Sequence, residues 1–125
     1  MRHKEESIQI ALSKYIKLKY PKVYFTSESS GLRVSIGTAK KMKSQRSRHK
    51  QLDMIILEPR KNYHALVIEL KKDTKEVYKN NGDYRKSQHI QEQLESIKFL
   101  KDKGYFATFG CGYKNCIDLI NWYMS

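Results

Sequence analysis

Apolar residues recur every four positions near the start of the chain, at Ile8, Leu12 and Ile16. This spacing keeps them on one face of an α-helix. The pattern predicts an amphipathic helix over about residues 4–20. We expect Pro21 to end it, because proline lacks the amide hydrogen that the next helical turn needs.

Two apolar, β-prone runs follow in the middle of the chain, at residues 52–57 and 65–70. A short polar segment joins them, so the pattern predicts a β-hairpin. Each run is apolar at nearly every position rather than at alternate ones. We therefore expect both strands to be central in a sheet and covered on each face.

The pattern in the rest of the chain predicts two further helices and two further strands. Residues 23–26 and 105–109 are strand-like, and residues 39–43 suit a helical turn. Residues 72–86 are polar and rich in turn residues, which predicts a mobile loop. A helix is expected over residues 87–103, with a glycine after its last turn. The stripes of the two later helices are Ile90, Leu94, Ile97 and Leu100, then Cys116, Ile117, Ile120, Tyr123 and Met124.

A chain of 125 residues with 39% hydrophobic residues fits a single domain over residues 1–125 with its own core. No apolar run approaches the roughly 20 residues that span a bilayer, and the start lacks the apolar core of a signal peptide. We therefore expect a cytoplasmic protein. Cys111 and Cys116 fit ordinary reduced cysteines better than a zinc site or a disulfide.

Charge narrows the range of partners. The chain carries 25 Lys and Arg against 13 Asp and Glu, a net charge of +12. Such an excess disfavours a compact state unless a partner or solubility explains it. Nucleic acid is the favoured partner, because neutralising phosphates releases counterions. A merely basic, soluble protein is the alternative, and a membrane surface fits less well because no basic helix has a bulky apolar face.

The positive charge is densest just before the first central strand. A run of this kind is often only a solvated surface. Its position makes it a candidate for contacts to nucleic-acid phosphates. The basic residues are Lys40, Lys41, Lys43, Arg46, Arg48 and Lys50.

Carboxylates within the two apolar strands point to chemistry. Asp53 and Glu69 interrupt these runs, where an unpaired carboxylate is costly to bury. Lys71 follows Glu69 on the same face, about 7 Å along the strand. Two carboxylates suit a hard divalent cation that activates water, and an ammonium group balances charge on a phosphate. Taken singly, each of these residues is a weak signal, because a Glu–Lys pair at a strand end is more often a surface salt bridge than a catalytic pair.

Two further polar residues fall on apolar helix stripes. Gln93 lies between Ile90 and Ile97, so it faces inward and needs a partner, either a catalytic group or a strand carbonyl. Glu5 precedes Ile8 by one turn. It is a candidate site carboxylate or a support for one, although acidic residues are common in any first helical turn.

Together these residues resemble the PD-(D/E)xK nuclease motif and, more narrowly, the virus-type replication-repair nuclease (VRR-NUC) family. The resemblance covers almost the whole chain in order. It differs at Leu52, where the family usually has proline, and at residues 48–51, where it is usually glycine-rich. The matching stretches are Glu5-Glu6-Ser7-Ile8-Gln9, Asp53, Val67-Ile68-Glu69-Leu70-Lys71, His89-Ile90-Gln91-Glu92-Gln93, Leu100 and Gly104-Tyr105-Phe106-Ala107.

The resemblance implies a restriction-endonuclease-like α/β fold, a three-layer α-β-α sandwich with a mixed central sheet. It implies Mg²⁺ or Mn²⁺ held by Asp53, Glu69 and the carbonyl of Leu70, with Lys71, Gln93 and Glu5 assisting catalysis. Stand-alone members are similar to Holliday-junction resolvases and tend to be homodimers, and phages often carry them.

The sequence therefore predicts a metal-dependent endonuclease that hydrolyses phosphodiester bonds in DNA. Branched or flapped structures of the kind met in repair and recombination are the expected substrates. The main alternative is a non-catalytic, basic nucleic-acid-binding module on a nuclease-like fold. A restriction-type enzyme with sequence specificity fits less well, because the short chain has no obvious recognition insertion.

Overall fold

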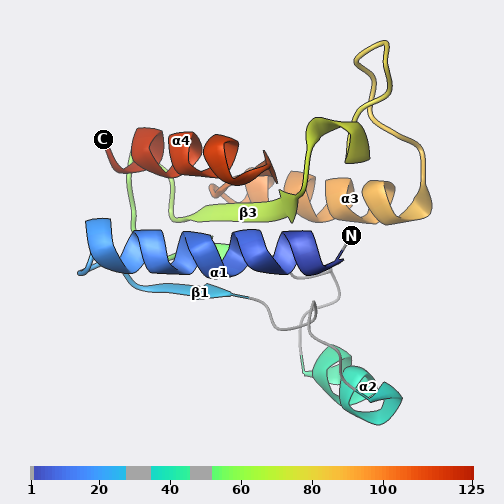
Figure 1. Ribbon diagram of the computed structural model, residues 1–125, viewed down its shortest axis with the longest axis horizontal. Helices are drawn as coiled ribbons and strands as arrows, with labels where there is room; N and C mark the ends of the chain where they lie inside the picture. The colour runs from blue at the N-terminus through green and yellow to red at the C-terminus, as the bar shows by residue number, and fades with distance from the viewer. Residues whose placement is uncertain (1, 28–34, 46–51) are drawn as a thin grey trace.

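The computed structural model describes residues 2–27, 35–45 and 52–125 (Figure 1). Within these residues, four strands and four α-helices follow one another in the predicted order, together with a 3₁₀ turn. In chain order they are α1 (Arg2–Lys19), β1 (Phe25–Ser27), α2 (Ile36–Ser44), β2 (Met54–Ile56), β3 (Leu66–Lys71), η2 (Thr74–Glu76), α3 (Gln88–Asp102), β4 (Phe106–Cys111) and α4 (Tyr113–Met124).

The four strands form one mixed sheet in the order β1-β2-β3-β4. The first two pairings are antiparallel, and Met54 of β2 lies opposite Ile68 of β3. The predicted hairpin of β2 and β3 is thus confirmed. β3 and β4 are parallel, with Glu69 opposite Phe109. Parallel neighbours need a long crossover, which the chain makes through α3.

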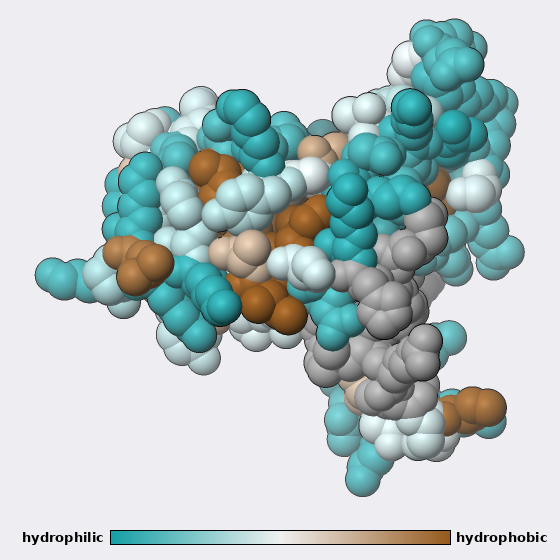
Figure 2. Space-filling view, in the orientation of Figure 1, coloured by the Kyte–Doolittle hydropathy of each residue, from teal (hydrophilic) through white to brown (hydrophobic). Residues whose placement is uncertain are grey.

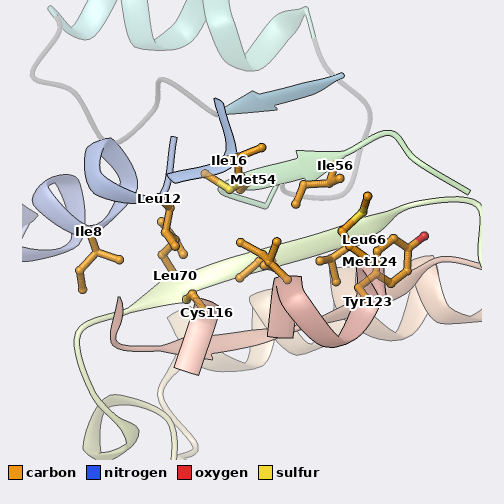
Figure 3. Close-up of a cluster of buried hydrophobic side chains, with 12 residues drawn as sticks. Ile8, Leu12, Ile16, Met54, Ile56, Leu66, Leu70, Cys116, Tyr123 and Met124 are labelled. Atoms are coloured by element: carbon orange, nitrogen blue, oxygen red, sulfur yellow. The ribbon is translucent and has the colours of Figure 1, made fainter. Parts of the chain in front are cut away.

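Helices cover both faces of this sheet. One core cluster joins α1 and α4 to the strands, and Figure 3 shows its side chains meeting between those helices and β3. The second cluster joins α3 to the opposite face. The predicted three-layer α-β-α architecture is confirmed. The first cluster contains Ile8, Leu12, Ile16, Met54, Ile56, Leu66, Ile68, Leu70, Cys116, Ile120, Tyr123 and Met124.

β3 is the centre of the domain, and all six of its residues are buried. Successive side chains of a strand point to opposite faces. Ile68 and Leu70 therefore enter the cluster with α1 and α4, whereas Val67 enters the cluster with α3. Burial on both faces explains why β3 is apolar at most positions rather than at alternate ones, because neither set of side chains meets water.

The first central strand is shorter than predicted. The pattern placed Asp53 inside an apolar strand, but β2 begins at Met54 and Asp53 lies at a bend just before it. The reason is a competing hydrogen bond. The amide of Leu70 donates to the Asp53 carboxylate at 2.7 Å. This side chain therefore replaces the backbone hydrogen bond that would otherwise continue the pairing of β2 with β3.

The segment predicted as a mobile loop has regular structure. Residues 72–86 include η2 and a small hairpin, closed by hydrogen bonds between Lys79 and Asp83 and from Arg85 N–H to the carbonyl of Val77. Val77 is fully buried in the cluster with α3. A single valine in a polar stretch did not predict that this segment packs against the core.

The basic segment begins as a helix. α2 is longer than the predicted turn at 39–43, because Ser35 caps it by accepting a hydrogen bond from Thr38 N–H. In Figure 1 it stands away from the sheet. Figure 2 shows a surface that is largely hydrophilic with scattered apolar residues. Within the described ranges, no helix is both long and apolar enough for a membrane span.

A test of this core is Gly110→Ala in β4. A methyl group there would lie 2.5 Å from the Cys116 sulfur and 2.8 Å from a methyl carbon of Ile68, closer than such atoms approach. We expect the free energy of unfolding to fall by about 1–3 kcal/mol, as in other overpacked cores. Urea denaturation measures it. Gly37→Ala on exposed α2 is the control, with no loss expected; equal stability of both variants would contradict the packing described.

Candidate active site

The candidate site lies where β3 ends. Glu69 and Lys71 occupy the last part of this strand and retain only 5% and 4% of their exposure. Removing a carboxylate and an ammonium group from water costs several kcal/mol per ion unless partners compensate. Charged side chains buried this way in a central strand mark the site. They also explain why polar groups of other elements converge here.

The first of these groups is the amide of Gln93 on α3. It is fully buried, as its place on the helix stripe predicted, and its Nε2 donates to Glu69 Oε2 at 2.6 Å. The same nitrogen lies 3.0 Å from Nε2 of His89, one helical turn earlier. An amide nitrogen with two hydrogens satisfies both acceptors when the histidine is neutral and protonated on Nδ1. Gln93 therefore holds Glu69 in place and is itself held by His89.

Asp53 reaches the site from the bend before β2. Besides accepting from Leu70 N–H, it is anchored through its backbone, because Gln9 of α1 donates to its carbonyl at 3.3 Å. The carbonyl of Leu70 points toward β2, the side from which Asp53 comes. The carbonyls of Ala65 and Lys71 accept hydrogen bonds from the chain of β4, and successive carbonyls of a strand point to opposite edges, so that of Leu70 points away from β4. Asp53 and the Leu70 carbonyl are thus neighbours.

Glu5 enters from α1, whose N-terminus lies beside the end of β3 (Figure 1). Burial, a hydrogen bond to Glu76 and the charges of Glu76 and Asp53 raise the pKa of Glu5 to about 7, although Lys71 opposes them. Two carboxyl groups that share a hydrogen bond need one proton between them. Glu5 therefore lies close enough to Asp53 and Lys71 for their charges to affect its pKa. Its role in the site stays a prediction.

Three residues of this arrangement were not expected as site residues. Glu76 lies on η2 and accepts from Lys72 N–H at 2.8 Å, which places it beside the end of β3. Only the fold of residues 72–86 reveals it. Gln9 and His89 were detectable, because each lies four residues, or about one helical turn, from the predicted inward residues Glu5 and Gln93.

The oxygen atoms of this site suit a hard divalent cation. Asp53, Glu69 and the Leu70 carbonyl supply donors of the type that Mg²⁺ and Mn²⁺ prefer. In the part of the chain that the structure describes, no three Asp, Glu, His or Cys side chains cluster closely enough to hold a metal alone. Magnesium sites commonly use one or two carboxylates and complete their shell with water. The residues present therefore fit the predicted metal.

The predicted phosphate contacts divide into two groups. Lys40, Lys41 and Lys43 are exposed on α2. Arg46, Arg48 and Lys50 lie outside the described residues.

The two cysteines form no disulfide. Cys111 is half-buried and pairs with Lys71 in the ladder, whereas Cys116 is buried in α4. Burial raises the pKa of Cys116 to about 12, so it stays a neutral thiol.

A solved structure described as a VRR_NUC domain protein resembles this chain. The TM-score is 0.67 and the sequence identity 26%, over 96% of this chain and 87% of that one. No protein-family model and no curated protein matches the chain significantly. The likeness confirms a restriction-endonuclease-like fold and indicates a nuclease-like domain. It supports the VRR-NUC family, which the sequence motifs resemble.

The carboxyl pair predicts a pH-dependent stability. The pKa of Glu5 rises from 4.5 to about 7 on folding, so the folded state binds the proton more tightly. Between these values the contribution of Glu5 to stability falls as pH rises. Glu5→Gln should remove this loss and raise the free energy of unfolding above pH 7 by on the order of 1 kcal/mol, after allowing for solvent screening.

Urea denaturation of both proteins across this pH range measures the effect. At a pH below 4.5 the carboxyl is protonated in both the folded and the unfolded protein, so the Glu5→Gln difference should lose its pH dependence there. A constant difference at every pH would contradict the shared proton.

Proposed function

We propose that this protein is a metal-dependent endonuclease that hydrolyses phosphodiester bonds in DNA. The observation that carries the proposal is the burial of Glu69 and Lys71 at the end of the central strand, beside Asp53. A chain that needed only stability would place apolar residues there, since burying charges rarely adds stability. The VRR_NUC neighbour adds support, because its name refers to nucleases.

Each residue has a role that its position allows. Asp53, Glu69 and the Leu70 carbonyl would hold Mg²⁺ or Mn²⁺. When bound, such an ion lowers the pKa of a water molecule and so supplies the hydroxide for hydrolysis. Gln93 keeps the Glu69 carboxylate oriented through its 2.6 Å hydrogen bond. The Lys71 ammonium would stabilise charge on the phosphate, and Glu5 would exchange a proton beside it.

The proposed substrate is branched or flapped DNA of the kind formed in repair and recombination. Exposed lysines on α2 supply contacts to phosphates, which position DNA without reading its sequence. A homodimer would place two sites on one Holliday junction, which suits a resolvase. The family resemblance supports both features, as it does an origin in phages.

Cleavage tests the enzyme directly. The purified protein is incubated with labelled four-way junction, flap, single-stranded and duplex DNA, in Mg²⁺, Mn²⁺ or EDTA. Asp53→Asn and Lys71→Ala should each slow cutting by at least about 100-fold, since each removes a group that stabilises charge in the transition state. EDTA should abolish cutting.

Lys98→Ala is the matched control, because Lys98 is exposed on α3 and its loss changes the net charge as Lys71→Ala does. It should cut at the parent rate. Tight, salt-sensitive binding of DNA without cutting in any metal would contradict the enzyme and favour a non-catalytic binding module.

The α2 lysines predict a change in salt dependence. Replacing Lys40, Lys41 and Lys43 with glutamine should weaken DNA binding and reduce the slope of log K against log salt by about 2 to 3, because each phosphate contact contributes about 0.9. Fluorescence anisotropy across a salt series measures this. Replacing Lys17, Lys98 and Lys101, which are exposed on other helices, removes the same charge. An equal effect of both triple variants would assign no special role to α2.

A further inference from the structure

Two tyrosines form a stacked pair on the small hairpin of residues 77–85, which follows β3 and η2. The rings of Tyr78 and Tyr84 lie 5.1 Å apart and nearly parallel, at 27°. They belong to opposite arms of the hairpin and are paired through their backbones. Tyr78 is half-buried, whereas Tyr84 keeps 44% of its exposure. Tyr84 therefore stacks on the half-buried Tyr78 and still keeps much of its surface exposed to solvent.

This pair lies next to the candidate site. The ring of Tyr84 is 6.4 Å from that of Phe109 on β4, and Phe109 is the ladder partner of Glu69. Phe109 belongs to the core cluster on the α3 face, the face from which Gln93 reaches Glu69. Tyr84 is thus one strand away from Glu69, on the same side of the sheet. A nucleotide adjacent to the reacting phosphate would lie within reach of it.

The surroundings of Tyr84 suit a polyanion. Figure 2 shows a hydrophilic surface over the hairpin, which projects from the body in Figure 1. All residues from Asn80 to His89 are exposed. A surface that binds both the bases and the phosphates of a single strand needs aromatic rings next to cationic side chains. Within residues 72–89, Lys72, Lys75, Lys79, Arg85 and Lys86 outnumber Asp73, Glu76 and Asp83.

We infer that the exposed ring of Tyr84 stacks on an unpaired base of the DNA substrate, while Lys79, Arg85 and Lys86 contact the phosphates of the same strand. This inference rests on the proposed nuclease function and specifies what the site recognises. A base within a duplex has both faces covered by its neighbours. Only an unpaired or displaced nucleotide offers a face to the tyrosine, so the contact would favour flapped and branched DNA over plain duplex.

The experiment measures stacking without cutting. The full chain carrying Lys71→Ala binds a flap that contains the fluorescent base 2-aminopurine at its first unpaired position, in EDTA. Stacking on the tyrosine should quench the fluorescence. Adding Tyr84→Leu should remove the quenching and weaken flap binding by about 5- to 100-fold, as for other base–aromatic contacts. Binding of the matched duplex should change less than about twofold.

Two further variants separate stacking from folding. Tyr84→Phe keeps the ring and should keep both quenching and flap affinity. Tyr24→Ala removes another exposed tyrosine, beside β1 at the far end of the sheet, and should leave both unchanged. Urea denaturation confirms that the Tyr84→Leu protein is folded.

Quenching that survives Tyr84→Leu, or equal loss of flap and duplex binding, would overturn the inference. Failure of the parent protein to cut any substrate would refute the nuclease instead. The two failures are distinguishable because the stacking measurement uses no cleavage.

Discussion

The structure depends on the burial of two opposite charges in its central strand. Glu69 and Lys71 lie in β3, where all six residues are buried and the others are apolar. Because these ions lose their hydration, neighbouring elements must supply polar partners. α3 accordingly carries a glutamine within its apolar stripe. β2 begins only after Asp53, whose carboxylate takes the Leu70 amide.

The same constraint explains the carboxyl pair at the edge of the site. Glu5 and Glu76 come from segments far apart in the sequence and meet beside Lys71. The ammonium group draws negative charge toward it, and the shared proton limits the repulsion that two carboxylates would otherwise exert. A phosphodiester has the negative charge that an ammonium group at a strand end attracts. Stability is thus reduced at the place where the proposed chemistry occurs.

In the described part of the chain, two segments project away from the sheet and the helices that pack on it (Figure 1). α2 presents lysines away from the sheet, and the hairpin of residues 77–85 presents Tyr84 beside β4. Lysines attract any nucleic acid, whereas a ring distinguishes unpaired from paired bases. In the proposed nuclease, the sheet and its helices would hold the reacting groups in fixed positions, and the two projecting segments would contact the DNA.

The sequence by itself indicated the main helices, the central strands and most residues of the candidate site, and the three layers followed from the family that it resembles. Hydrophobic periods marked α1, α3, α4 and the central strands, because each element must bury one face or both. Polar residues that broke those periods marked Asp53, Glu69 and Gln93. Only the tertiary structure decided the bend at Asp53, the anchor at Val77 and the meeting of Glu76 with Glu5. These features depend on contacts between distant segments, which local patterns of apolar and polar residues do not encode.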